Sequence, residues 1–218
     1  MKRVYIVVEG QTEQEFVNSV ISPYLQNFGI LSVTAVLIRT SRTGRGGMVG
    51  YSHLANTIKP LLMSEKSDYI VTTLIDFFRL PHDMPHYGDS MKKPDKIEQI
   101  KSLEEAINVA IGDRRFFSYI QLHEFEALLF SSNKGFEYYF SKELAEKTAS
   151  IISSYDNPED INTSPKGAPS KRLLAIKSDY NKVLEGNLIA LEIGIKSILE
   201  KCPRFAEWIN NIVEKCKE

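Results

Sequence analysis

The chain has 218 residues, of which 25% are charged and 43% hydrophobic, and its 27 Lys and Arg residues nearly balance 28 Asp and Glu residues. A chain of this length buries enough surface to fold without disulfides or a structural metal, and we expect one globular domain with an appendage. The near-neutral balance argues against a protein that binds nucleic acid through bulk positive charge alone.

The cysteines and the apolar segments indicate in which cellular compartment the protein is found. Cys202 and Cys216 lie close to the C-terminus without metal-ligand spacing, which suggests a reducing environment. The apolar run from Val4 to Val8 is too short for a secretory signal, and no run approaches the roughly 20 apolar residues of a membrane span. We therefore expect a cytoplasmic protein that does not enter a membrane.

The first half of the chain alternates predicted strands and helices. The β-branched and aromatic run from Val4 to Val8 is typical of a strand buried on both faces, and Gly10 ends it. Thr12 followed by Glu15 indicates a capping box at the start of the next helix. The other elements of this half are predicted as strands at 32–38, 68–75 and 116–122, and as helices near 54–62 and 97–111.

Two loops interrupt this pattern. The glycine-rich stretch 39–50 precedes a helix that Pro60 is expected to bend or end. The stretch 77–95 is a long loop, and long loops in compact domains are often functional. Alternating strands and helices imply parallel βαβ units with right-handed crossovers.

Only helices are expected after His123. The clearest is the last, because Pro203 suits a first turn and apolar residues recur behind it at helical spacing. The predicted helices lie at 123–130, 141–153, 169–180, 187–201 and 203–217. We therefore predict an α/β fold: a mostly parallel four-stranded sheet flanked by helices in residues 1–130, with a helical C-terminal extension, residues 131–218, packed on it.

Acidic residues follow three of the predicted strands. In an open parallel sheet the ligand site lies beyond the carboxyl ends of the strands, so these residues are expected at one crevice. Hard carboxylate oxygens gathered in one place suit Mg²⁺ or Mn²⁺, which would position a phosphate for reaction. The residues concerned are Glu9, Asp76, Glu124 and Glu126.

Each acid also has a structural interpretation. Asp76 could bond turn amides, and Glu13 could complement a helix dipole, whereas Glu9 ends a buried strand, where a structural role would usually use a small residue. Glu124 and Glu126 could be acids of a first helical turn. His123 suits a hydrogen-bonding role behind the ligands better than ligation.

Two basic stretches are candidates for phosphate binding. Arg42 and Arg45 lie in the glycine-rich loop, which could present amides and guanidiniums to a phosphate or could be a solvated loop. The loop lacks the Lys-Ser/Thr of a nucleotide P-loop. Lys171 and Arg172, with Lys177 and Lys182 further on, would ordinarily form a solvated helix face.

Hydrolase mechanisms that use other residues lack support in this sequence. His82 and His86 flank Pro85, which spoils a helical zinc pair. There is no Gly-x-Ser-x-Gly elbow, and neither cysteine has a nearby histidine.

Several motifs together resemble the prokaryotic domain-of-unknown-function family 4276, over nearly the whole chain. The opening motif is also similar to that of Toprim domains in topoisomerases, primases and the overcoming-lysogenization-defect nucleases. The segments that carry the resemblance are Val8–Glu13, Leu74–Phe77 through Leu80–Pro81, Gln121–Phe130, Pro158–Asn162 and Ala168–Arg172.

The Toprim resemblance implies a metal-dependent phosphodiester site. Glu9 matches the glutamate after the first strand, and Asp76 matches the first aspartate of the Asp-x-Asp motif. Position 78 is Phe instead of the second aspartate, so Glu124, Glu126 or Asp83 would have to supply the missing ligand. Some relatives of Toprim nucleases act beside ATPase partners in phage defence, and this chain has no ATPase of its own.

The leading hypothesis is a Mg²⁺- or Mn²⁺-dependent nuclease. Glu9, Asp76 and an acid from 124–126 would hold the metal, and Glu13 would act as base or outer ligand. The candidates for binding the substrate are Arg42, Arg45, His123, Lys171 and Arg172.

Two other hypotheses stay open. One is a catalytically inactive Toprim-like adaptor that binds an ATPase partner or nucleic acid, which Phe78 favours. The other is a small-molecule phosphatase. The sequence leaves open DNA against RNA, the partner and the oligomeric state.

Overall fold

The apolar runs of the first half form a parallel sheet in the computed structural model, which describes residues 2–39, 47–63, 68–161 and 167–217. The sheet has five strands in these residues, in the order β2-β1-β3-β4 with β5 also paired to β3, and all pairings are parallel. This confirms the predicted α/β class. The strands are β1 Arg3–Val8, β2 Ser32–Leu37, β3 Tyr69–Asp76, β4 Phe116–Phe117 and β5 Ile120–Gln121.

The strand expected at 116–122 is split into β4 and β5. Between them, the hydroxyl of Thr73 on β3 takes the place of a main-chain partner: it accepts from the N–H of Tyr119 (2.7 Å) and donates to the carbonyl of Tyr119 (2.8 Å). The N–H of Ser118 donates to the Asn108 side chain (2.7 Å). Side chains therefore satisfy the backbone where the regular ladder stops.

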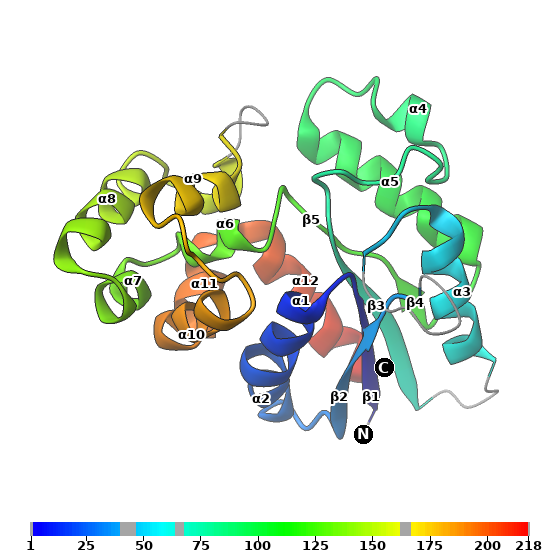
Figure 1. The fold of residues 1–218 in the computed structure, drawn as a ribbon. Helices are drawn as coiled ribbons and strands as arrows, with labels where there is room; N and C mark the ends of the chain where they lie inside the picture. Colours follow the sequence, from blue (N-terminus) through cyan, green and yellow to red (C-terminus); the bar gives the residue numbers. More distant parts are fainter. Residues whose placement is uncertain (1, 40–46, 64–67, 162–166, 218) are drawn as a thin grey trace.

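Helices surround the sheet in Figure 1. Those of the first half are α1 Gln11–Phe16, the π-helical turn η1 Val17–Ile21, α2 Ser22–Gln26, α3 Tyr51–Leu62, α4 Tyr87–Ser90 and α5 Lys96–Ile111. Those of the second half are α6 Glu126–Leu129, α7 Lys134–Tyr139, α8 Lys142–Ile152, the 3₁₀ turn η2 Pro158–Asp160, α9 Pro169–Ile176, α10 Leu184–Ile193, α11 Ile195–Lys201 and α12 Pro203–Lys217.

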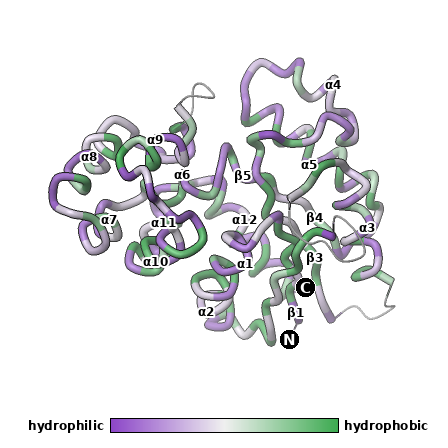
Figure 2. Tube along the Cα trace, viewed as in Figure 1, coloured by the Kyte–Doolittle hydropathy of each residue, from purple (hydrophilic) through white to green (hydrophobic). Residues whose placement is uncertain are grey.

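The two faces of the sheet bury different helices, because side chains alternate along a strand. Val4, Ile6 and Val8 of β1 join a core with α1, α2, α10 and α12. Val7 of β1 instead joins a second core with Leu54 of α3 and with α5. Figure 2 shows hydrophobic colouring along the strands and an alternation of hydrophobic and hydrophilic colours along the helices.

The helical second half completes the first of these cores. Phe205, Trp208 and Ile209 of α12 are buried beside the strands, and the Trp208 indole donates to the Thr72 hydroxyl of β3 (2.9 Å). Trp208 also stacks on Tyr119 with ring centroids 4.6 Å apart. The boundary placed at residue 130 stays a prediction. No helix in the described ranges is long and apolar enough to cross a membrane.

Some predicted details near the N-terminus are wrong. Thr12 and Glu15 do not form a capping box: α1 begins at Gln11, its N-cap is Gly10 without a side-chain cap, and Thr12 is buried inside the first turn. The helix starts early because the Gly10 carbonyl already accepts from Gln14 (3.1 Å). Pro60 lies inside α3, which continues for two more residues to Leu62, so it does not end the helix at its own position; the bend stays a prediction.

The helices of the second half also differ in their boundaries. α6 begins at Glu126 instead of 123, because His123 has a left-handed backbone (φ 73°) that no helix contains. The stretch expected as one helix at 187–201 starts at 184 and breaks at Gly194, where φ is 78°. A short helix, α7, was not predicted, and α9 ends at Ile176, before the predicted 180.

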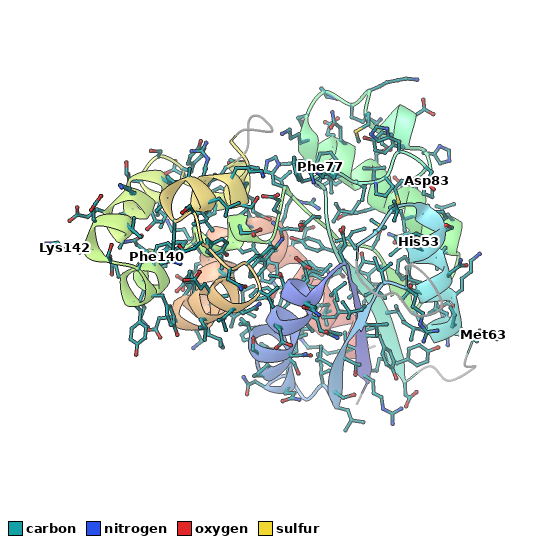
Figure 3. All side chains as sticks on the ribbon, viewed as in Figure 1. His53, Met63, Phe77, Asp83, Phe140 and Lys142 are labelled. Carbon is teal, nitrogen blue, oxygen red and sulfur yellow. The ribbon has the colours of Figure 1, made fainter. Side chains whose placement is uncertain are left out.

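Carboxylates from distant segments cap three helices, and we refer to Asp83, Glu124 and Glu159 as the capping carboxylates. Asp83 accepts from the first N–H of α3 (2.9 Å), Glu124 from the Ser170 N–H of α9 (3.1 Å), and Glu159 from the Arg204 N–H of α12 (2.9 Å). Figure 3 labels Asp83 close to His53 of α3. An acceptor with negative charge suits the unpaired donors of a helix start.

Candidate functional site

Four carboxylates gather where the parallel strands end. Glu9 follows β1 and Asp76 ends β3, and because these strands pair in parallel with Val8 beside Leu74, the two acids leave the sheet at the same edge. The Asp76 N–H donates to Glu9 Oε1 (3.0 Å). Glu13 in the first turn of α1 and Glu126 at the start of α6 complete the group.

Lys182 lies among these carboxylates. Its Nζ is 3.2 Å from Glu126 Oε2, 3.5 Å from Glu13 Oε1 and 3.9 Å from Asp76 Oδ2. We call Glu9, Glu13, Asp76, Glu126 and Lys182 the Lys182 cluster. One ammonium therefore faces four carboxylates, so the cluster carries an excess of negative charge when all are ionised.

Lys182 is the site residue that sequence reasoning missed, since it was interpreted as part of a solvated face. It lies in the turn before α10, and its side chain is 36% exposed. No local pattern distinguishes it from other lysines of the second half. Only the packing of α10 against α1 and α6 brings it to the end of the sheet.

Burial makes the ionised form of these acids costly. Burial raises the pKa of Glu9 from 4.5 to about 7, and the neighbouring Glu13 adds to this, whereas the bond from Asp76 and the charge of Lys182 oppose it. The pKa of Asp76 is raised well above its usual value, mainly by burial. Burial likewise raises the pKa of Glu126, and the positive charge of Lys182 offsets part of this increase.

Two buried polar groups in this region have no hydrogen bond. Glu126 is fully buried (0% exposed), yet neither carboxylate oxygen accepts a hydrogen bond. The hydroxyl of Tyr180 is also buried without a partner, and the charge of Glu126 adds to the effect of burial in raising the pKa of Tyr180. Gly186 makes room for it, since a Cβ there would lie 2.6 Å from the hydroxyl oxygen.

Glu124 is separated from this group although only one residue lies between it and Glu126. Its Oε2 accepts from the Ser170 N–H and its Oε1 from the Ser170 hydroxyl, both at 3.1 Å. Both oxygens are therefore used to hold the start of α9. We leave Glu124 out of the ligand set that is proposed below, and we leave Asp83 out because it caps α3.

His123 and Phe78, which follow the ends of β5 and β3, make structural contacts. His123 is buried, and its carbonyl accepts from the Phe78 N–H (3.0 Å). Burial, with the positive charge of Lys96, lowers the pKa of His123 to about 4, so its imidazole is neutral at pH 7. Phe78 lies under the Arg79 guanidinium (5.2 Å to the ring centroid).

Of the basic candidates, the structure describes Lys171 and Arg172. Lys171 is exposed on α9. The Arg172 guanidinium contacts other residues of the second half of the chain: it donates to the Gly167 carbonyl (2.8 Å) and to the Tyr155 hydroxyl (3.0 Å). Arg42 and Arg45 lie outside the described residues.

The Lys182 cluster fits a hard divalent cation by the chemistry of its donors. Carboxylate oxygens are the ligands that Mg²⁺ and Mn²⁺ prefer; Glu126 Oε1 has no hydrogen bond, and Oε2 has an ion pair with Lys182 (3.2 Å). The ligands are not preassembled: within the described ranges no three His, Cys, Asp or Glu side chains converge as a group that could hold a metal. The carboxylates surround the Lys182 ammonium instead.

Comparison with known proteins gives a family and two similar structures. No curated protein matches the chain in sequence. Two structures of the C-terminal region of the Xanthomonas campestris pv. campestris OLD protein are similar to it. One, phased with mercury, has 15% identity and a TM-score of 0.42, covering 97% of this chain and 98% of that one. The other, phased with iodine, has 17% identity and a TM-score of 0.43, covering 99% and 94%.

The family model matches almost the full length, from the end of β1 to α12. It carries the description "Domain of unknown function (DUF4276)" and spans residues 8–213, which include every residue of the Lys182 cluster. The chain therefore belongs to the DUF4276 family.

Proposed function

We propose that this protein is a Mg²⁺- or Mn²⁺-dependent phosphodiester hydrolase that acts on nucleic acid. The observation that supports the proposal is the Lys182 cluster: four carboxylates from separate elements meet at the carboxyl end of a parallel sheet, where ligand sites of such sheets lie. Structural acids are usually dispersed or bonded to main-chain amides. Glu126 in particular is fully buried with an ion pair to Lys182 (3.2 Å) and no hydrogen bond from a main-chain amide to either oxygen.

The residues of the cluster divide into roles. Glu9, Asp76 and Glu126 would hold the cation, and Glu13 would orient a water from the first turn of α1 or act as a base. A bound divalent cation would supply an activated water and neutralise charge on the phosphate. Among the residues that the structure describes, Lys182 lies at the cluster itself and would contact a phosphate oxygen, because a long flexible ammonium side chain suits such a contact.

Contacts to a polymer backbone would come from outside the cluster. Lys171 is exposed and suits sequence-independent phosphate contacts, whereas Arg172 would first have to leave Tyr155. The resemblance to Toprim nucleases extends the proposal to an ATPase partner and to phage defence.

A cleavage assay tests the proposal. Purified protein with Mn²⁺ is expected to cut DNA or RNA, and chelation to stop it. Asp76→Asn and Glu126→Gln should each lower the rate at least about a hundredfold, since each removes a charged ligand. Glu143→Gln, an exposed acid of α8, is the matched control and should cut normally. Cleavage of nucleic acid by Asp76→Asn at the normal rate would contradict the proposal, and turnover of mononucleotides alone would indicate a phosphatase.

A second candidate is a non-catalytic adaptor of the same shape. It is favoured by Phe78 in place of the second Toprim aspartate and by the lack of a preassembled three-ligand group in the described residues. Isothermal titration with Mn²⁺ separates the two: the adaptor predicts no saturable binding, and the hydrolase predicts binding that Asp76→Asn weakens.

A further inference from the structure

We propose that Lys182 is a built-in competitor of the metal: its ammonium takes the cation position in the metal-free protein, and a divalent cation must displace it to bind. The inference rests on the proposed function and adds a means of regulating the same site. Entry of the cation would free Lys182 from the carboxylates, so that it could contact substrate phosphate only after the site is loaded.

The Lys182 ammonium lies between three of the carboxylates. Lys182 Nζ contacts Glu126, Glu13 and Asp76, which come from α6, α1 and β3. Each of these three acids has its ion pair with this lysine. An ammonium and a divalent cation repel each other at such distances, so both cannot be bound by the same oxygens.

The fit of the lysine to the cluster is incomplete. Glu126 Oε2 lies 3.2 Å from Nζ, yet neither of its oxygens accepts a hydrogen bond, and the buried Tyr180 hydroxyl is unpartnered as well. Buried polar groups without partners destabilise a fold. A single positive charge thus leaves four carboxylates incompletely neutralised, and a divalent cation, which brings two charges and can accept several oxygens as ligands, suits them better.

The backbone beside Lys182 is held while its side chain can move. Lys177 pairs with Asp179 (3.0 Å) and Glu185 (3.1 Å), and Glu185 also accepts from the Asn181 N–H (2.8 Å). The Lys182 side chain is 36% exposed. Exchange therefore needs only rotation about side-chain bonds towards solvent, without a rearrangement of the fold.

Mn²⁺ affinity of the full chain, measured by isothermal titration, tests the inference. Lys182→Met should bind Mn²⁺ at least about tenfold more tightly than the unmodified protein, because the competing charge is gone. Lys59→Met, an exposed lysine of α3, removes the same charge elsewhere and should leave the affinity unchanged. Equal or weaker binding by Lys182→Met would overturn the inference and leave the proposed function intact. Absence of saturable binding in all three proteins would overturn both.

A measurement on the protein without a substitution tests the inference even if Lys182→Met does not fold. The lysines of this protein are dimethylated with ¹³C-labelled methyl groups, and the Lys182 signal is followed by NMR during titration with Mg²⁺. The chemical shift of the Lys182 methyl groups should move when Mg²⁺ replaces the ammonium among the carboxylates. A Lys182 signal that is unchanged at saturating Mg²⁺ would overturn the inference.

Discussion

The capping carboxylates and the acids of the Lys182 cluster have opposite surroundings. Each capping carboxylate receives at least one main-chain N–H from the start of a helix. In the Lys182 cluster, one main-chain N–H reaches Glu9, and Glu126 is paired with the Lys182 ammonium (3.2 Å) without a main-chain donor. The difference shows that burial of an acid does not by itself identify a functional site. What separates the two groups is that a helix start donates a main-chain N–H to each capping carboxylate, although Glu159 Oε1 has no partner, whereas Glu126 has the Lys182 ammonium instead.

Glu124 and Glu126 show the difference over a distance of two residues. Glu124 turns to α9 and bonds Ser170 with both oxygens, whereas Glu126 turns to Lys182 and carries unsatisfied oxygens. The first is explained by the architecture alone. The second makes sense if another ligand completes the site.

Removal of a capping carboxylate should have the largest effect on stability. Glu159 is fully buried and accepts from the Arg204 N–H of α12. Glu159→Ala leaves this buried helix start without an acceptor, and we expect a loss of about 3 kcal/mol in the free energy of unfolding.

Urea denaturation measures this loss. Glu143→Ala, which removes an exposed pair on α8, should change stability by less than about 0.5 kcal/mol. Mn²⁺ affinity should be unaffected in both variants. A loss below about 1 kcal/mol in Glu159→Ala would mean that the cap is not a main support of α12.

The second expected effect is a pH dependence that comes from the cluster. The pKa of Glu9 is raised to about 7 from 4.5, so the folded state binds this proton more tightly than the unfolded state. The resulting stability is fully present below about pH 4.5 and is lost as the pH rises through 7. The loss between pH 5 and pH 8 should be about 2–3 kcal/mol in metal-free protein.

Comparison with Glu9→Gln isolates this contribution. The stability of the variant relative to the unmodified protein should rise between pH 5 and pH 8, because the amide does not ionise. Unfolding free energies from urea titrations at both pH values measure it. A constant difference between the two proteins would show that Glu9 does not titrate as its burial predicts.

The smallest effect is expected at Glu124. Glu124→Gln keeps one acceptor for Ser170 and loses the other and the charge, so stability should fall by about 1 kcal/mol. Mn²⁺ affinity should stay unchanged, whereas Glu126→Gln should weaken it. Thermal unfolding measures the stability, and isothermal titration measures the Mn²⁺ affinity. Equal weakening of Mn²⁺ binding in Glu124→Gln and Glu126→Gln would contradict the distinction between the capping carboxylates and the Lys182 cluster.

The sequence alone predicted β1, β2 and β3 to within a residue or two, because continuous β-branched and aromatic runs bounded by turns suit little else. It also predicted that Glu9 and Asp76 leave the sheet at one edge, since that follows from parallel pairing. The helix boundaries were less accurate. The start of α6 depends on the left-handed backbone of His123, which tertiary contacts impose and local propensity does not encode.

The division of the acids was decided by tertiary structure. Glu124 and Glu126 are equivalent as sequence, and only the position of α9 gives one of them a donor. Lys182 reaches Glu126 across more than fifty positions of chain because α10 packs on α1 and α6. The residue pattern of a strand is a local property, so the strands could be predicted from the sequence. Which charge faces which is a property of distant segments packed together, and it emerged only in the folded molecule.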